Sequence, residues 1–405
     1  MGLLADYCLY NSGNECPTVY HVWSCLAAFS TVLSRKVWLN RDYFKIFPNL
    51  YILLVGDAGS GKNTARNIAA RKLVIDNFPD IPVSASVTTR EDVCKFMGSE
   101  DGLRTFHNPD GSIQEYHPFF FSVDELSNLL SVDFRKTVDF LVDLYDSEFF
   151  STSFKHDTTK DKIPFPCATM LACTIPDWFM RSMKMDLFTG GLGRRLTIVY
   201  ENKSILIAEP TVPPGGHEAW KRVVEHLQTA RELIGEMKLS PSCVKWWNKW
   251  YENDKRLETD DPILRQIYST KHVILQKVAM LTALDERPFR MVLEPDDFVK
   301  ALAMLDLLEP PLRKLSAGVG RNELAAISVQ FMDTLACMHG VAAESKLRNM
   351  FFRDCKVQGN EFNLMVKHLM DTDQIMVMTD ARNGKPQNYV FLPDAYERYQ
   401  KEKKM

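Results

Sequence analysis

The segment that most limits how this chain can fold runs from residue 51 to residue 71. An apolar, strand-like run, Tyr51-Ile-Leu-Leu-Val55, leads into a glycine-rich loop that ends in Gly61-Lys62, and a helix-forming stretch follows. Glycines let such a loop fold back so that several backbone N–H groups point at one centre, where the N-terminus of the helix adds partial positive charge. We therefore expect a phosphate-binding loop with ATP as its ligand. The predicted contacts are Gly56, Gly59, Ser60, Gly61, Lys62, Asn63 and Thr64.

One position departs from the usual pattern of such loops. The lysine is normally followed by Ser or Thr, whose hydroxyl coordinates Mg²⁺. This chain has Asn63 at that position and Thr64 one residue later. An amide carbonyl oxygen is an acceptable ligand for a hard cation, so we expect Asn63 to bind Mg²⁺ directly or through water. The substitution leaves both efficient and weak hydrolysis open.

A second motif strengthens the nucleotide prediction. The apolar run from His117 to Val123 ends in two adjacent carboxylates, Asp124 and Glu125. In P-loop ATPases such a strand lies beside the loop strand, its first acid holds the water shell of Mg²⁺, and its second polarises the attacking water. We therefore expect Asp124 to be a metal-site residue and Glu125 to be catalytic.

Composition restricts the class of protein. With 405 residues and 45% hydrophobic content, the chain can form two or three domains with real cores. Its longest nearly apolar stretch, Val22 to Leu33, is shorter than the ~20 residues that a membrane helix needs. The N-terminus lacks the basic start of a secretory signal, and the nine cysteines include no C-x-x-C pair. We expect a cytoplasmic protein with reduced thiols and no membrane partner.

The rhythm of the sequence predicts several parts. Residues 1–45 are expected to form a helical N-terminal segment. Residues 46–210 alternate strands and helices, which is typical of an α/β domain with a parallel sheet. The expected strands are 50–55, 83–88, 119–123, 168–174 and 196–201. A Pro- and Gly-rich run at 209–216 begins the next part, residues 211–316. We expect 217–315 to be almost wholly helical, with helices at 217–237, 241–256, 263–284 and 295–308.

The last part, residues 317–405, has a different rhythm. Helices are expected at 322–338, 344–352 and 359–370, followed by strands at 375–379 and 388–392 that an Asn383-Gly384 turn connects. Three helices followed by a hairpin form a winged helix. Lys367 and His368 lie on the third helix, and Arg382 and Lys385 lie at the tip of the wing. DNA contact and packing against a neighbouring protein are both open for this module.

The order of these motifs resembles a known family. A short helical N-terminus, the Gly-Lys loop, the acid-ending strand, a polar hairpin, the strand ending at Thr174 and the segment Gly190-Gly-Leu-Gly-Arg-Arg195 follow one another. This layout resembles the primase-helicase-type AAA+ ATPases of phages and mobile elements, often described only as a domain of unknown function. It is also similar to superfamily 3 and MCM-like helicases.

The resemblance has several implications. It implies a P-loop AAA+ core, an all-helical lid, and a homo-oligomeric ring, expected to be a hexamer, that uses ATP and Mg²⁺ and binds DNA. Fewer than 60 residues precede the glycine-rich loop, so primer synthesis would come from a separate primase or other replication protein.

The same resemblance assigns further catalytic roles. Thr174 would orient the attacking water, and Arg194 or Arg195 would act as an arginine finger on the γ-phosphate held by the neighbouring subunit. The sequence does not choose between the two arginines. Nor does it choose a second sensor residue from the lid. The candidates for that role are Arg265, Lys271 and Lys277.

A polar hairpin is expected between residues 150 and 164. In the superfamily 3 and MCM-like branch, a hairpin at this place projects into the pore of the ring and contacts the DNA backbone. Its cations are suited to phosphate contacts that do not read sequence. The predicted contacts are Lys155, His156, Lys160 and Lys162. A merely solvated hairpin is the equal alternative.

The sequence thus predicts an ATP-dependent, ring-forming AAA+ protein that acts on DNA, as a helicase or replication initiator of a phage or mobile element. Two alternatives stay open. One is a nucleotide-controlled switch that binds DNA or protein and hydrolyses ATP weakly. The other is an AAA+ remodeller of proteins within a defence system.

Overall fold

The computed structural model describes residues 2–85, 89–146, 150–153, 160–184, 191–201, 206–253, 262–318, 322–354, 359–379, 386–392 and 395–396. The chain forms two compact units, Met1–Ser316 and Ala317–Met405. Within these described ranges, no helix combines the length and the apolar character that crossing a membrane requires.

The larger unit is built on a five-stranded sheet with the order β4-β5-β8-β3-β9. The strands are β3 (Tyr51–Val55), β4 (Arg104–His107), β5 (Ile113–Val123), β8 (Pro166–Thr174) and β9 (Leu196–Tyr200). Strands β5, β8, β3 and β9 run parallel to one another, and β4 is antiparallel to β5 at the edge. The α/β class predicted from the sequence is thereby confirmed.

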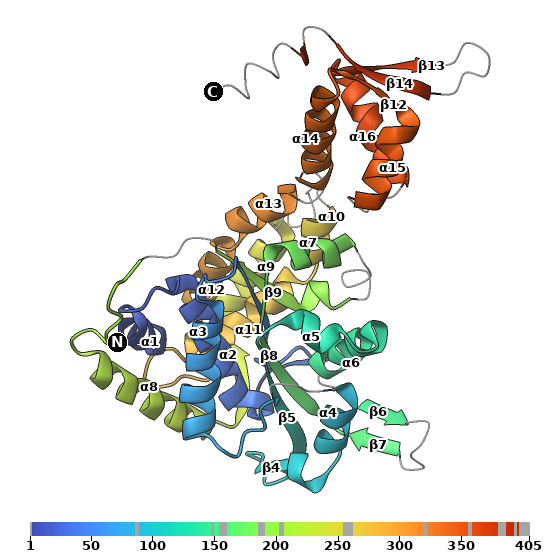
Figure 1. The fold of residues 1–405 in the computed structure, drawn as a ribbon. Coiled ribbons are helices and arrows are strands. Elements are labelled where there is room, and N and C mark those ends of the chain that lie inside the picture. The colour runs from blue at the N-terminus through green and yellow to red at the C-terminus, as the bar shows by residue number, and fades with distance from the viewer. Residues whose placement is uncertain are drawn as a thin grey trace. The chain divides into compact units, whose positions relative to one another are not determined.

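Helices cover both faces of this sheet (Figure 1). Every residue of β3 is buried, as expected for a parallel strand with both faces covered. Ile52 and Leu54 belong to the apolar core that includes α2 (Thr18–Leu33). Tyr51 faces the other side, where its hydroxyl donates to the carbonyl of Leu141 on α6 (Phe134–Asp146) over 2.9 Å.

Shorter elements complete this part of the unit. The remaining helices are α1 (Leu3–Asn11), α3 (Lys62–Asn67) with its π-helical continuation η2 (Ile68–Ile75), α4 (Arg90–Met97), α5 (Leu126–Leu130) and α7 (Pro176–Lys184). The 3-10 turns are η1 (Ser34–Lys36), η3 (Glu100–Gly102) and η4 (Gly193–Arg195). Strands β6 (Phe150–Ser153) and β7 (Lys160–Ile163) pair as an antiparallel hairpin, as predicted.

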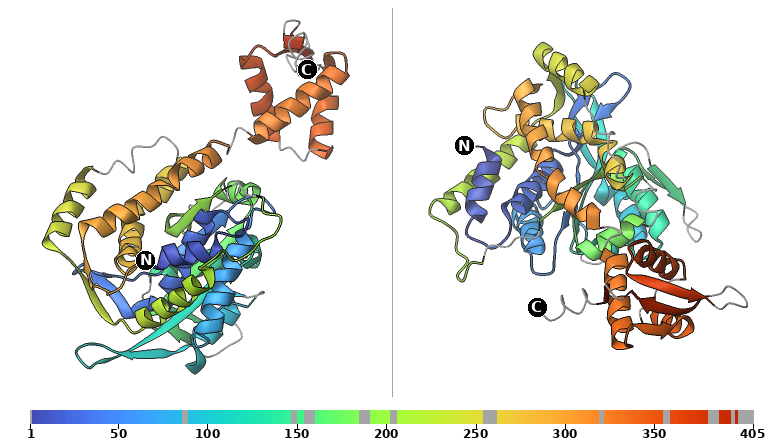
Figure 2. Two further views of the ribbon diagram at one scale, coloured as in Figure 1. Left: turned by 90° about the vertical axis from the view of Figure 1, so that its left-hand side faces the viewer. Right: turned by 90° about the horizontal axis from the view of Figure 1, so that it is seen from above.

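A second sheet, with the order β11-β10-β1-β2, joins distant parts of the chain. Its strands are β1 (Val37–Asn40), β2 (Lys45–Ile46), β10 (Gly235–Leu239) and β11 (Val292–Leu293). The helices of this unit that follow residue 215 are α8 (Gly216–Arg231), α9 (Pro241–Asn253), α10 (Pro262–Tyr268), α11 (Lys271–Ala283), α12 (Pro295–Asp306) and α13 (Glu309–Gly318). Helix α1 lies along α8 in each view (Figure 1, Figure 2), where Arg222 pairs with Asp6.

The prediction of a helical segment over residues 1–45 was wrong at β1 and at the start of β2. Residues 211–316 are not all-helical, because they contain β10, whose first three residues were expected to end a helix, and β11. Strand β1 pairs in parallel with β10, with Val37 opposite Gly235. Strands of two to five residues give too brief an alternation to be recognised, and the partner of β1 lies far along the chain. The division of the larger unit into 1–45, 46–210 and 211–316 stays a prediction.

The predicted strand at 83–88 was also wrong in extent. Val83 makes one isolated parallel bridge to Phe120 of β5, and residues 86–88 lie outside the described ranges. The Phe120 N–H donates to the Pro82 carbonyl and the Ser84 N–H donates to the Phe120 carbonyl, both over 2.9 Å. Proline cannot donate to a ladder, which limits the pairing of this segment. The segment nevertheless lies beside β5.

The smaller unit contains α14 (Asn322–Cys337), α15 (Glu344–Asp354) and α16 (Gly359–Asp371). Its three-stranded sheet has the order β12-β14-β13, made of β12 (Val341–Ala343), β13 (Ile375–Thr379) and β14 (Pro386–Phe391). Four rings form its centre, namely Phe331, Phe351, Phe362 and Tyr389. The expected helices and both expected strands are present. The sequence missed only the three-residue β12.

Candidate functional site

The glycine-rich loop joins the carboxyl end of β3 to α3 and has a fixed backbone path. Gly59 and Gly61 have φ of 84° and 82°, in the left-handed region that glycine adopts without strain. A Cβ on Gly61 would lie 2.9 Å from the Cα of Cys16, so the loop packs closely against the segment before α2. The N–H of Gly56 donates to the Thr174 carbonyl over 3.3 Å, which ties the loop to β8.

A buried tyrosine of α2 holds the base of the loop, and sequence reasoning missed it. The Tyr20 hydroxyl lies 2.6 Å from the carbonyl oxygen of Val55 and 2.5 Å from that of Glu201. A Cβ on Gly56 would come within 2.3 Å of the same hydroxyl. Tyr20 therefore joins the ends of β3 and β9 directly beneath the loop. A tyrosine at a helical core position carries no sequence signal for such a contact.

The loop lysine points back into its own loop. Lys62 is 7% exposed, and its Nζ donates to the carbonyls of Gly56 and Asp57 over 2.6 and 2.7 Å. The Ser60 hydroxyl lies 3.3 Å from the same nitrogen. Burial lowers the pKa of Lys62, whereas nearby acidic groups, Glu125 among them, raise it. The ammonium of Lys62 thus lies at the centre of the loop, where it would contact a bound anion.

The two predicted carboxylates follow β5 at the same edge of the sheet. The expectation that their strand lies beside the loop strand was wrong, because β8 lies between β5 and β3. Asp124 is exposed, and Glu125 is half-buried at the start of α5. The fully buried Thr174, at the end of β8, donates its hydroxyl to Oε1 of Glu125 over 2.7 Å. Thr174 at the end of β8 and Glu125 after the neighbouring strand β5 are therefore in direct contact.

The buried thiol of Cys173 lies near several charged side chains of this cluster. Burial raises the pKa of Cys173 to about 12. Arg66 and Lys62 lower that pKa, while Glu125 and Asp124 raise it. All four groups thus lie within electrostatic reach of a single atom beneath the loop.

Arg66 is a functional candidate that sequence reasoning missed. It is 8% exposed on α3, and its guanidinium donates to the Ser122 hydroxyl over 2.9 Å and to Oδ1 of Asn67 over 3.0 Å. Arg66 follows Lys62 by four residues and therefore lies on the same face of the helix, and this spacing could have identified it from the sequence. Arg66 therefore holds α3 against the end of β5.

The oxygen-bearing side chains at this edge are suited to Mg²⁺. Asn63, Thr64 and Asp124 are all exposed, at the start of α3 and the end of β5. Magnesium keeps several waters and is usually held by one or two carboxylates together with substrate phosphates. An exposed carboxylate beside a phosphate-binding loop fits that requirement. Among the residues described, no group of three or more His, Cys, Asp or Glu side chains forms a self-sufficient metal site.

The two candidate finger arginines have different environments. Arg195 is 8% exposed and makes a bidentate ion pair with Asp146, with Nε–Oδ1 at 3.0 Å and Nη2–Oδ2 at 2.5 Å. Its Nη1 also donates to the Gly191 carbonyl over 2.9 Å. Arg194 is exposed, and its backbone carbonyl accepts from Thr270. Arg195 is thus held inside its own subunit, whereas the side chain of Arg194 projects into solvent.

Both arginines lie at the end of the sheet opposite to the glycine-rich loop. They precede β9, and β9 runs parallel to β3 with Leu196 opposite Tyr51 and Tyr200 opposite Val55. The loop follows Val55 at the carboxyl end. A strand of this length spans about 16 Å. Arg194 therefore cannot serve the loop of its own chain.

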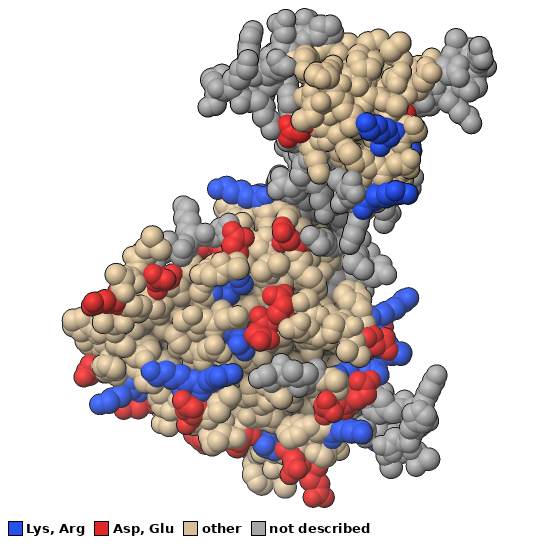
Figure 3. Space-filling model, viewed as in Figure 1, with Lys and Arg blue, Asp and Glu red and all other residues tan. Residues whose placement is uncertain are grey.

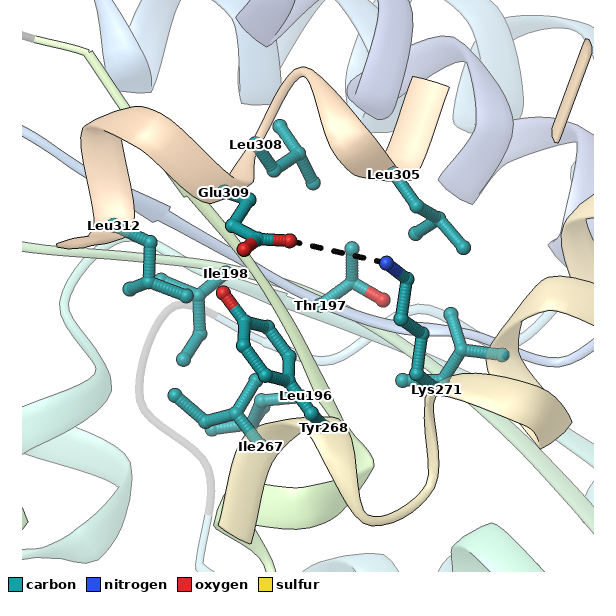
Figure 4. Close-up of a pocket in the computed structure, with 11 residues that line it drawn as sticks. Leu196, Thr197, Ile198, Ile267, Tyr268, Lys271, Leu305, Leu308, Glu309 and Leu312 are labelled. Carbon is teal, nitrogen blue, oxygen red and sulfur yellow. Dashed lines mark ion pairs between the residues drawn. The ribbon is translucent and has the colours of Figure 1, made fainter. Parts of the chain in front are cut away.

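The lid candidates for a second sensor also lie away from the loop. Lys277 donates to Asn49, which precedes β3 at its amino end, so Lys277 lies at the end of the sheet opposite to the loop of the same chain. Lys271 is paired with Asp306 over 2.7 Å and with Glu309 over 3.9 Å, beside an apolar pocket near the start of β9 (Figure 4). Arg265 is exposed on α10, which contacts η4.

The predicted DNA contacts are only partly described. Lys160 and Lys162 lie on β7, and the side chain of Lys162 is exposed. Lys155 and His156, and the wing residues Arg382 and Lys385, lie outside the described residues. On the face of the larger unit seen in Figure 3, basic and acidic side chains are interspersed.

Comparison with known proteins adds no relative. No protein-family model matches this chain, and no curated protein matches it. The function proposed below is therefore based on the geometry of the site.

Proposed function

We propose that this chain is an ATP-hydrolysing protein of the P-loop AAA+ type that forms a homo-oligomeric ring and acts on DNA, as a helicase or replication initiator of a phage or mobile element. One observation carries the proposal. Thr174 is hydrogen-bonded to Glu125 at the same sheet edge where Lys62 fills the centre of a glycine-rich loop.

The position of the loop within the sheet supports nucleotide binding. Strand β3 lies between β8 and β9, although both follow it in the chain. Ligands of open parallel sheets bind at the carboxyl ends of the strands where the strand order changes direction. The turn into α3 adds the backbone N–H groups of a helix N-terminus and its partial charge. Lys62 would exchange its loop carbonyls for phosphate oxygens.

Each residue of the cluster has a role in this proposal. Glu125 would polarise the attacking water, and its hydrogen bond from Thr174 holds one carboxylate oxygen in position. Asp124 and Asn63 would hold Mg²⁺, which when bound offsets the negative charge of the phosphates. Arg66 and Tyr20 are positioning residues that keep α3, β5 and the loop together.

The active site would be shared between subunits. Arg194 is exposed at the amino end of β9, too far to reach the loop of its own chain, but a second copy can present it to that loop. Such a head-to-tail contact joins two different faces of the protein, and a contact of this kind forms a ring when its rotation closes. We assign Arg194, rather than the ion-paired Arg195, as the finger.

The decisive experiment measures ATP hydrolysis by the full chain with and without single-stranded DNA, on particles whose mass is determined in the same buffer. Hydrolysis by an oligomer, accelerated by DNA, is the expected result. Hydrolysis without any response to DNA would favour a protein remodeller. A monomer with full activity would refute the shared site.

Asn63 favours a second candidate function, a nucleotide-controlled binding switch with weak hydrolysis. The Asn63 side chain is exposed at the position where a Mg²⁺-binding hydroxyl is usual. If the amide is the poorer ligand, Asn63→Ser should raise the hydrolysis rate or lower the Mg²⁺ concentration needed for half-maximal rate. Phosphate release across a Mg²⁺ titration measures both. A large loss of activity in Asn63→Ser would instead mark the amide as the working ligand.

The DNA part of the proposal predicts a change in salt dependence. The chain has a formal net charge of −3, so DNA binding must use a few local cations. Each phosphate contact to a single strand contributes about −0.7 to the slope of log affinity against log salt. Replacing Lys160 and Lys162 by alanine should reduce the slope by about 1.4, as measured by fluorescence anisotropy. The double variant of the exposed Lys238 and Lys300, on β10 and α12, is the matched control.

A further inference from the structure

A cavity of about 390 Å³ lies at the amino end of the central sheet, away from the glycine-rich loop. Its walls come from η1, the segment 43–49 before β3, the end of α6, and α11. All of these belong to the larger unit. The volume falls within the range of natural small-molecule sites, about 300–1,000 Å³.

Positive charge dominates the lining of this cavity. Arg35, Lys45 and Lys277 line it together with one acidic residue, Asp146, which is paired with Arg195. A site with this balance of charge attracts an anion. Arginine in particular matches the oxygens of a phosphate with its fork of donors.

Lys277 is a built part of the cavity rather than a surface charge. It is 3% exposed, and its Nζ donates to two neutral oxygens of Asn49, the carbonyl at 2.9 Å and Oδ1 at 2.7 Å. The amide of Asn49 in turn donates to the carbonyls of Tyr145 and Ala168, which fixes its orientation. Burial lowers the pKa of Lys277 to about 7, because a charged ammonium is unfavourable away from water. An anion that binds beside Lys277 makes the charged form more favourable.

Aromatic side chains form the rim. Tyr43 and Phe44, in the loop between β1 and β2, are 98% and 55% exposed, although large apolar side chains are usually buried. Arg41 ties this loop to α11 through a 2.7 Å hydrogen bond to Gln276. Inside the cavity, the Arg35 guanidinium lies 4.0 Å from the ring centre of Phe47. Exposed rings beside a cationic cavity are the arrangement that stacks a base and holds its phosphate.

We propose that this cavity binds a nucleoside monophosphate unit, with its base stacked on Tyr43 and Phe44 and its phosphate held by Arg35 and Lys277. The unit is either a free mononucleotide or the phosphorylated end of a nucleic-acid strand. The site is separate from the glycine-rich loop because Asn49 precedes β3 and the loop follows it. It does not depend on ATP hydrolysis by this chain.

The test uses isothermal titration calorimetry on the full chain carrying Lys62→Ala, which removes the anchoring cation of the loop. Adenosine monophosphate and a 5′-phosphorylated trinucleotide are titrated separately, and the tighter ligand identifies the natural source. We expect about one binding event per chain. Arg35→Gln or Lys277→Met should each weaken it at least tenfold, and Lys300→Met, an exposed lysine on α12, should leave it unchanged.

A rim variant keeps the test valid if Lys277→Met fails to fold. Because Tyr43 and Phe44 are exposed, the double alanine variant should fold normally and weaken binding by about tenfold, the scale of one stacked base. The proposal is overturned if neither ligand binds, or if binding survives both the rim and the cation variants. Inorganic phosphate that binds as tightly as adenosine monophosphate would also overturn it, because the rings would then contribute nothing.

Discussion

Replacing Lys62 by alanine should abolish nucleotide binding, whereas replacing Glu125 by glutamine should preserve binding and stop hydrolysis. Lys62 supplies the buried cation at the centre of the loop and would exchange its two carbonyl partners for phosphate oxygens. Each hydrogen bond to a charged group is worth about 1.5–3 kcal/mol, so two such bonds outweigh the binding energy that remains. In our proposal Glu125 polarises the attacking water and does not contact the nucleotide, so its loss should lower the turnover rate by about 10²–10⁴. Calorimetric titration with ATP measures binding, and phosphate release measures turnover.

Thr174 provides a graded control for the Glu125 result. Thr174→Val keeps the shape of the buried side chain but removes the hydroxyl that donates to Oε1 of Glu125. Thr174→Ser keeps the hydroxyl. Turnover should fall in the valine variant and persist in the serine variant, while both bind ATP like the parent. Parental rates of hydrolysis in Lys62→Ala and Glu125→Gln would show that the site assignment is wrong.

The sequence predicted the parts of this site that depend on local pattern. Around Lys62, the apolar run predicts the strand, the glycines predict the loop, and the helix-forming residues predict the helix. The structure has all three elements. The contact between Thr174 and Glu125 was also within reach, because adjacent parallel strands end at the same edge of a sheet. The information for the loop lies within one continuous segment, whereas Thr174 and Glu125 are 49 residues apart and each is placed by the end of its own strand.

What the sequence could not predict depends on partners far along the chain. The Tyr20 hydroxyl meets Val55 and Glu201 only after three elements have packed together. Strand β10 is a strand because β1 pairs with it, and a five-residue segment gives no periodicity that overrides the helical pattern on either side. Local propensity was outweighed there by tertiary pairing.

The roles of the two adjacent arginines also depend on a partner far along the chain. They lead to the second prediction with a large expected effect, a loss of turnover in Arg194→Ala. The sequence does not distinguish Arg194 from Arg195, but among the described residues only Arg195 pairs with a carboxylate, that of Asp146. Arg194→Ala should therefore leave folding and ATP binding intact and lower turnover by about 10³ or more, the effect of losing an arginine finger. Arg195→Ala should instead lower the free energy of unfolding by about 2 kcal/mol, because it removes charged hydrogen bonds. Chemical denaturation and phosphate release separate the two outcomes.

A mixing experiment decides whether Arg194 acts across a subunit interface. Arg194→Ala subunits keep an intact loop, and Lys62→Ala subunits keep an intact finger. Each preparation alone should be nearly inactive. Mixed rings contain interfaces that pair the intact loop of one subunit with the intact arginine of its neighbour, so partial activity should return in proportion to the fraction of such interfaces. Arg194→Lys, which keeps the charge but not the fork of donors, should not restore full activity. If mass measurement proves co-assembly and no activity returns, Arg194 does not complete the site of a neighbour.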